Sequence, residues 1–301
     1  MGKVRTTKEI NSVAEYLEYL RGIEFLAKRT YSVGCYTFFR GQANREWKII
    51  PGLYRDDLFT SESLLLIELQ HICPEEFLTN RFETLVKMQH FGLPTRLLDT
   101  TTNPLVALYF ACKDDNEAEK DGIVYIFPNL PVMWSTNQIV DLIMDFVFEY
   151  HPSNMWVEHV ADMSQQKYPL LINGLTEQNI RTLLHYYTIP AMAVMPAKTN
   201  ERIEAQDGAF FIFGMKVRDT RASTNSGTFG RTYYNFDPVE ITSPSNICKD
   251  AKEILIPSQA KQSILKQLDI LGFNERKLFP DLEHKIQYTI QDVLANRFNG
   301  F

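Results

Sequence analysis

Polar side chains that could hold an anion stand at the ends of two apolar segments. Arg40 closes the apolar run CYTFF, and Gly41 follows it directly. A guanidinium binds a phosphate or a carboxylate through parallel hydrogen bonds, and a glycine lets a ligand approach the backbone closely. The same position also suits an arginine that pairs with a structural acid at the edge of a sheet. These residue types predict either an anion site at Arg40 or a structural ion pair there.

A second polar group surrounds two leucines, with Arg96 before them and Asp99 after them. If this piece is extended, the two side chains lie on opposite faces and cannot pair, whereas in a turn they could meet. Three threonines follow, and Thr102 or Asn103 can cap a helix that Pro104 opens. Two interpretations stay open: Arg96 and Asp99 are buried polar pins, or the strand end, threonines and helix start form one wall of a polar pocket.

A third group precedes the apolar run GAFFIF. Gln206 is expected to lead this strand, and Gly208 again permits close approach. Glu201 and Glu204 are candidates for acid–base chemistry, although a glutamate before a strand is more often solvated. His90 beside an aromatic-glycine turn could titrate near neutral pH or be a hydrogen-bonded core residue.

Composition limits the classes of function. The formal charge of −6 gives no overall attraction to nucleic acid or to an anionic membrane, so only a local basic groove could bind either. No apolar stretch reaches the ~18 residues of a membrane span. The four cysteines lack CxxC or Cys/His spacing, which argues against a disulfide framework and a zinc site. We therefore expect a cytoplasmic protein that binds no metal and no membrane.

Periodicity predicts helices interleaved with strands. The expected helices cover residues 6–22, capped by Thr6 and Glu9, and residues 61–71, 74–90, 104–114, 135–150, 176–187, 258–272 and 281–298. The expected strands cover residues 34–40, 121–128, 190–196, 202–217 and 252–257, with a long loop or hairpin over 221–238. Strict βαβ alternation is absent, which favours an α+β fold with a mixed sheet. Neither GxGxxG nor a P-loop is present.

Four stretches resemble the FRG domain family: FFRGQ at 38–42, MQHFGLPTRLLDTTTNPLVALYFAC at 88–112, RIEAQDGAFFIF at 202–213 and LFPDLE at 278–283. The family takes its name from the triplet that is Phe39-Arg40-Gly41 here. The resemblance implies an FRG domain over residues 31–290, enlarged at about 129–200 and 218–250. A helix within residues 1–30 would pack on its core, and residues 291–301 would form a tail. Thr100 and Asp207 depart from residues common in the family.

The order of these motifs also resembles the ADP-ribosyltransferase fold, an α+β fold with a mixed sheet core, here with helical insertions and C-terminal helices. By that resemblance Arg40 would hold the pyrophosphate of NAD, and Thr100 and Thr101 would support the nicotinamide ribose. Glu204, Gln206 or Asp207 would stand at the catalytic glutamate position, although a glutamine cannot supply the charge that stabilises an oxocarbenium-like state.

The remaining residues of the implied NAD site are Gly41, Gln42, His90, Arg96 and Asp99. The function implied is an NAD-dependent ADP-ribosyltransferase-like enzyme of a bacterial toxin or phage-defence system. The acceptor is unknown and could be a protein, a nucleic acid or a small molecule. The alternative is a non-catalytic FRG module that binds a nucleotide, a nucleic acid or a protein.

Overall fold

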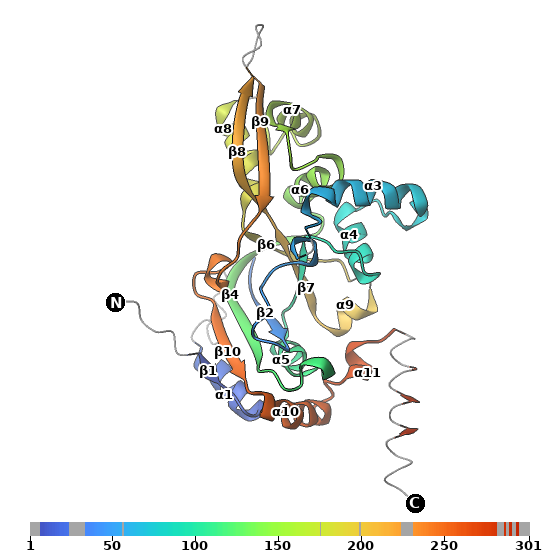
Figure 1. Cartoon of the computed structure of the whole chain (residues 1–301), viewed down its shortest axis with the longest axis vertical. Helices are drawn as coiled ribbons and strands as arrows, with labels where there is room; N and C mark the ends of the chain where they lie inside the picture. The colour runs from blue at the N-terminus through green and yellow to red at the C-terminus, as the bar shows by residue number, and fades with distance from the viewer. Residues whose placement is uncertain are drawn as a thin grey trace, which may run out of the picture.

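The computed structural model in Figure 1 describes residues 7–23, 34–55, 57–174, 176–198, 200–223 and 231–281, and positions 286, 289, 290, 293 and 294. Within these residues the chain is an α+β protein with ten α-helices and ten strands in two sheets. The predicted fold class is confirmed at this level. None of the described helices is long and apolar enough to cross a membrane.

Five strands close into a small mixed barrel. The larger sheet has the order β1-β10-β4-β2-β3-β7-β6, and β4 also pairs with β6, which joins the two ends of the run β4-β2-β3-β7-β6. The strands are β1 (Lys8–Glu9), β2 (Cys35–Gln42), β3 (Leu97–Thr101), β4 (Gly122–Trp134), β6 (Ala191–Met195), β7 (Gly208–Phe213) and β10 (Lys252–Ile256). The pairs β1–β10 and β4–β6 are parallel, and the other pairs are antiparallel. The length of β4 permits closure, because its first part pairs with β10 and β2 and its last part with β6.

Aromatic side chains fill the barrel. Phe211 meets Phe38 and Phe127 edge to face, with ring centroids 5.6 and 5.2 Å apart. Because successive side chains of a strand point to opposite faces, Phe39 lies outside the barrel. There it packs with α5 (Pro104–Cys112), whose residues Val106 and Ala107 are fully buried. Strand β2 therefore contributes side chains to two cores, one on each side of the sheet.

Three further helices complete the core outside β2 and β10. They are α1 (Val13–Gly22), α10 (Ser258–Ile270) and α11 (Glu275–Leu278). The predicted cap of the first helix was wrong: Glu9 lies in β1, and the side chain of Ser12 accepts from the backbone N–H of Glu15. Thr6 lies outside the described residues. Lys8 and Glu9, which we expected in the first helical turn, instead form β1 and pair with β10.

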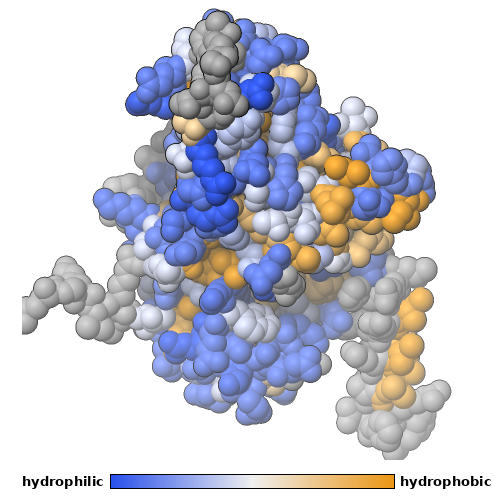
Figure 2. Space-filling model, turned by 45° about the horizontal axis from the view of Figure 1, so that its top comes forward, coloured by the Kyte–Doolittle hydropathy of each residue, from blue (hydrophilic) through white to orange (hydrophobic). Residues whose placement is uncertain are grey.

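A third core lies in the upper part of Figure 1. Its helices are α3 (Glu62–Ile72), α4 (Arg81–His90), α6 (Gln138–Glu149), α7 (Val157–Lys167) and α8 (Glu177–Thr188). A second sheet with the order β5-β9-β8 packs on it, formed by β5 (Met155–Trp156), β8 (Met215–Ser223) and β9 (Arg231–Pro238). The predicted hairpin excursion is confirmed. In Figure 2 exposed apolar side chains gather over α3, where Leu64, Ile67 and Ile72 are exposed.

Two predicted elements differ from the structure. The helix expected over 74–90 begins only at Arg81, because the Asn80 side chain caps it. The strand expected from residue 202 begins at Gly208, because residues before it form the short helix α9 (Glu201–Ala205), capped by Asn200. Most of the helix expected over 281–298 lies outside the described residues. The predicted domain boundaries stay predictions, and β6, which falls within residues 129–200, is a barrel strand.

Candidate functional site: a cavity beside the Phe-Arg-Gly strand

A cavity of about 300 Å³ lies where β2, β3 and β7 meet the ends of α4, α5 and α9. Many of the residues that line it come from the motifs singled out in the sequence. Those residues are Arg40, Gly41, His90, Asp99, Thr100, Thr101 and Gln206. Chain segments more than 150 residues apart thus line one cavity. This arrangement agrees with the interpretation in which the strand end, the threonines and the helix start form one wall of a polar pocket.

The guanidinium of Arg40 is only partly satisfied by the protein. Its Nη1 donates to the backbone oxygen of Asp99, whereas its Nε is enclosed and has no hydrogen-bond partner in the described part of the chain. Burial lowers the pKa of Arg40, and the charge of Asp99 opposes that shift. No carboxylate among the described residues forms an ion pair with Arg40. The alternative of a structural acid paired with Arg40 therefore does not apply within them.

Asp99 is held in place by α4. Its Oδ1 accepts a hydrogen bond from Gln89 Nε2 at 2.9 Å, and Gln89 in turn accepts one from Thr95. Of the residues that line the cavity, all of them described, Asp99 is the only acid. Its carboxylate is exposed and lies on the strand next to Arg40, so the cavity wall carries both signs of charge.

The two threonines of β3 differ in their hydrogen bonds. Thr101 Oγ1 donates to the backbone oxygen of Gln206 at 2.7 Å and accepts from the backbone N–H of Asn103 at 2.9 Å. Thr100 Oγ1 is buried and has no partner in the described part of the chain. A buried hydroxyl without a partner is costly. Thr101 therefore has a structural role, whereas the buried Thr100 hydroxyl has no hydrogen-bond partner among the described residues.

The α9 turn forms the far wall and contacts Leu278 and Phe279, which follow it by about 70 residues in the chain. Gln206 Nε2 donates to the backbone oxygen of Leu278 at 2.9 Å. Arg202 lies with its guanidinium carbon 4.8 Å from the centre of the Phe279 ring. Asn200 and Arg202 line the cavity, although sequence reasoning did not single them out. The only signal for Arg202 was its place in the motif RIEAQDG.

Five candidate residues from the sequence do not line the cavity. Glu201 and Glu204 are exposed on α9, and Asp207 is exposed and accepts a hydrogen bond from the Asn103 side chain at 2.9 Å. Gln42 is buried and donates to the backbone oxygen of Lys48 at 3.4 Å, with its Oε1 unpartnered among the described residues. Arg96 is buried in an ion pair. His90, by contrast, does line the cavity, and its ring is exposed at the end of α4 beside Phe91, which rules out the buried core interpretation.

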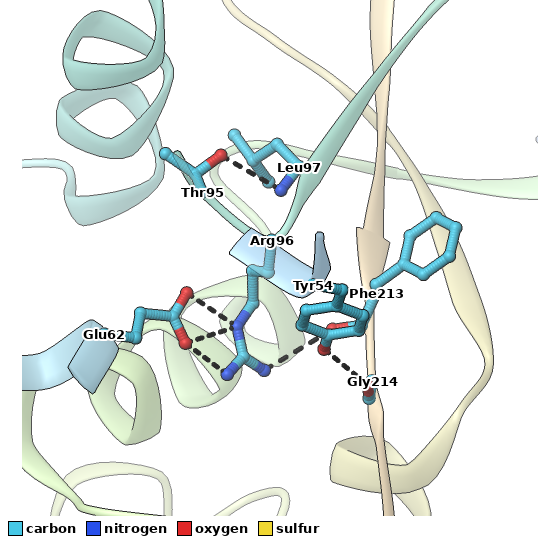
Figure 3. A network of polar contacts seen from close by, with 7 residues as sticks. All are labelled: Tyr54, Glu62, Thr95, Arg96, Leu97, Phe213 and Gly214. Carbon is cyan, nitrogen blue, oxygen red and sulfur yellow. Dashed lines mark hydrogen bonds and ion pairs between the residues drawn. The ribbon is translucent and has the colours of Figure 1, made fainter. Parts of the chain in front are cut away.

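Figure 3 shows Arg96 between Glu62 and the end of β7. Its Nε lies 2.9 Å from both carboxylate oxygens of Glu62, and its Nη1 donates weakly to the backbone oxygen of Phe213 at 3.4 Å. Tyr54 Oη donates to the backbone oxygen of Gly214 at 2.7 Å in the same network. Burial, the largest single effect, lowers the pKa of Arg96, but the charges of Glu62 and Tyr54 and the hydrogen bond to Glu62 together outweigh it, and the net direction is upward. Arg96 and Asp99 therefore do not pair: Arg96 is a structural pin, and Asp99 faces the cavity.

The described residues contain no group of three or more His, Cys, Asp or Glu side chains placed to hold a metal. The cavity offers guanidinium, amide, hydroxyl and imidazole groups with one carboxylate. This donor set suits an organic anion with hydroxyl groups.

Comparison with known families identifies one domain. Residues 36–120 match the family model of the FRG domain. The chain contains an FRG domain. The match includes Arg40, Asp99 and Thr100, whereas α9 with Arg202 lies outside it. No curated protein matches the chain, and no solved structure matches it. The expected resemblance to the ADP-ribosyltransferase fold therefore stays a prediction.

Each residue of the FRG triplet has a separate physical role. Phe39 packs outside the barrel against α5, and Arg40 reaches the cavity. A Cβ on Gly41 would lie 1.8 Å from the backbone oxygen of Ala107 in α5, so only glycine lets this helix approach. In three successive residues the triplet thus provides a side chain of the core, a cation in the cavity lining and a glycine that lets α5 pack closely.

Proposed function

We propose that the FRG domain of this protein binds a nucleotide in the cavity, with Arg40 as the phosphate-binding cation. The observation that carries the proposal is the state of the Arg40 guanidinium: half-buried, without a carboxylate partner and with an unpartnered Nε among the described residues. A buried cation in this state is stabilised when an anion supplies the missing acceptors.

The other groups of the cavity suit the remainder of a nucleotide. Arg202 is a second cation on the opposite wall, and a cavity with two guanidinium groups and one carboxylate favours a ligand with negative charge. The hydroxyl of Thr100 and the amide of Asn200 can serve ribose hydroxyl groups. Phe110 and Ile203 provide apolar surface. At about 300 Å³ the cavity is at the small end for ligand sites, which suits a mononucleotide or part of a dinucleotide.

Calorimetry with AMP, ADP-ribose and NAD tests this proposal. Wild-type protein should bind at least one of the three, and Arg40→Ala should abolish the heat signal while the protein remains folded by circular dichroism. Arg40→Lys keeps the charge without the planar fork and should bind more weakly than wild type. Arg181→Ala, an exposed arginine on α8, is the matched control and should bind as wild type. A folded wild-type protein that binds none of the three nucleotides would contradict the proposal, as would full affinity in Arg40→Ala.

NAD-dependent ADP-ribosyl transfer is the second candidate, and the position of Asp99 favours it. In this reaction the bond between ribose C1′ and the nicotinamide nitrogen breaks, and nicotinamide leaves with the electron pair. An acceptor nucleophile then bonds to C1′ and gives up its proton. A carboxylate beside the ribose stabilises the cationic transition state. Asp99 lines the cavity and Glu204 does not, so the carboxylate in this candidate is Asp99.

Nicotinamide release from NAD separates the two candidates. If transfer or hydrolysis occurs, Asp99→Asn should bind NAD with near-unchanged affinity and lose release of nicotinamide. If the wild-type protein binds NAD without releasing nicotinamide in the presence of cell extract as a source of acceptors, the domain is a nucleotide-binding module.

A further inference from the structure

The three-stranded sheet β5-β9-β8 projects from the body at the end opposite α1 and α10 (Figure 1). The two described arms of its hairpin carry four basic and two acidic residues, in a chain whose formal charge is −6. The basic residues are Lys216, Arg218, Arg221 and Arg231. The sequence TNSGTFG, which connects the arms, has no charged residue. The hairpin is thus locally basic on an acidic protein.

One face of this sheet presents a row of aromatic and basic side chains. Trp156 pairs with Tyr233, and Tyr233 pairs with Arg221 on the other side. Residues directly opposite each other in an antiparallel pair share a face, so these three side chains lie side by side. Arg231 lies with its guanidinium carbon 4.6 Å from the centre of the Trp156 ring, and the Trp156 ring also stacks on His159, with ring centroids 5.4 Å apart.

The two faces of the sheet have different environments. On one face Met155 and Phe236 are buried against α6, α7 and α8. On the other, the side chain of Arg221 is 75% exposed, Arg231 is exposed and Tyr233 is half-exposed. In Figure 2 the projecting part is covered mainly by hydrophilic side chains. The aromatic and basic row therefore faces solvent.

Arg218 pairs with Asp219 at 3.1 Å and with Asp237 at 3.2 Å, whereas neighbouring acids neutralise Arg221 and Lys216 only weakly. Arg221 lies 3.9 Å from Asp219, and Lys216 lies 4.0 Å from Glu240, with all four side chains well exposed. Exposed ion pairs of this length contribute little free energy. These cations can therefore exchange a carboxylate for a phosphate at small cost.

We propose that this face binds single-stranded nucleic acid. Arg221 and Arg231 contact backbone phosphates, and unpaired bases stack on Tyr233 and on the outer side of the Arg231–Trp156 pair. Proteins that bind single strands combine a basic track with aromatic rings in this way. A duplex cannot use the rings, because its bases are already stacked, and an acidic peptide would use only the cations. The surface is distinct from the cavity that contains Arg40.

Fluorescence anisotropy with labelled oligo(dT) and oligo(U) tests the proposal on the full chain. Strands of about 20 nucleotides exceed the ~4–16 nucleotides that one site of this kind covers. We expect both to bind, more tightly than a duplex of equal length, with affinity falling as salt rises from about 50 to 200 mM. A preference between the two strands would identify RNA or DNA as the ligand.

Variants separate charge from stacking. Arg221→Glu and Arg231→Glu should each weaken binding about tenfold or more and reduce its salt dependence. Tyr233→Ala should weaken binding by about 5- to 100-fold without changing the salt dependence, and Tyr233→Phe should restore it. Lys252→Glu is the same charge reversal at an exposed residue of β10, which lies outside the barrel, and should bind as wild type.

Several outcomes would overturn the proposal. These are no binding by the wild-type protein at low salt, equal binding of duplex or of polyglutamate, or an equal loss in Lys252→Glu. Arg40→Ala should retain full affinity for the strands, so this proposal and the nucleotide cavity can fail independently.

Discussion

Arg96 and Glu62 form an ion pair that is almost completely buried, with side-chain exposures of 3% and 6%. It joins the start of β3 to the first turn of α3, which lie 34 residues apart in the chain. The Nη1 of Arg96 donates to the backbone oxygen of Phe213, the last residue of β7. The pair thus fixes the strand on which Asp99, Thr100 and Thr101 stand, and it acts on the cavity only through position.

Removing one partner of this pair should strongly destabilise the fold. Arg96→Ala leaves the Glu62 carboxylate buried without a counter-charge, which costs about 3–5 kcal/mol in comparable cases. Urea unfolding followed by circular dichroism measures the change. Arg181→Ala removes one partner of the exposed Arg181–Glu177 pair and is the control, for which we expect a change of less than about 1 kcal/mol. Similar losses in the two variants would contradict the structural role of Arg96.

Gly41→Ala should disturb the packing of α5. The added Cβ would meet the backbone oxygen of Ala107 at 1.8 Å, and a backbone atom cannot move aside as the end of a side chain can. We expect a loss of about 3 kcal/mol or more in the free energy of unfolding. Gly22→Ala places the same methyl group where nothing lies within 4 Å and should be neutral or slightly stabilising. Equal melting temperatures for wild type and Gly41→Ala would refute the close approach.

The neighbouring threonines should respond oppositely to the same substitution. Thr101→Val removes a hydroxyl with two hydrogen bonds, leaving the Gln206 carbonyl and the Asn103 N–H unpaired, and should cost about 1–3 kcal/mol. Thr100→Val removes a buried hydroxyl without a partner among the described residues and should leave stability unchanged or raise it by up to about 1–3 kcal/mol.

Nucleotide affinity provides the second readout for this pair. Thr100→Val should weaken nucleotide binding in calorimetry, although the substitution does not lower stability. If Thr100→Val destabilises the protein as much as Thr101→Val does, the Thr100 hydroxyl has a structural partner, and its assignment to the ligand is wrong.

Stability should fall at alkaline pH through the buried thiol of Cys112. Burial raises the pKa of Cys112 from its ordinary value of 9.0 to about 12, and the charge of Lys261 opposes the shift. Between pH 9 and 12 the unfolded state loses the thiol proton while the folded state keeps it. The folded state then binds more protons, so stability decreases as pH rises, by up to about 1.4 kcal/mol per pH unit.

Comparison of wild type with Cys112→Ala isolates this contribution. Urea midpoints between pH 8 and 10 should fall more steeply in wild type, because the variant has no thiol to ionise at this position. Measuring below pH 10 limits the part played by the buried tyrosines, whose pKa values are also raised by burial. Parallel pH profiles for the two proteins would show that the thiol ionises equally in both states.

Local sequence patterns were sufficient for most elements and for one wall of the cavity. A run of strand formers predicted β4, and proline at the first helical position predicted α5. Arg40, Asp99 and Thr100 were singled out because their types and positions suit an anion site, and they do line one cavity. These features depend on neighbouring residues, which a sequence displays directly.

Only the tertiary structure decided which distant groups meet. In the structure Arg96 pairs with Glu62, and β4 and β6 pair to close the barrel. Residues 201–205 form a helix, which places Arg202 in the lining of the cavity. Each outcome depends on competition among long-range contacts: a buried guanidinium takes the nearest buried carboxylate, and the Asn200 cap outweighs local strand preference. The sequence by itself determined the types of groups available to the cavity. Their pairing and burial, which leave Arg40 without a carboxylate partner among the described residues, were decided by the fold.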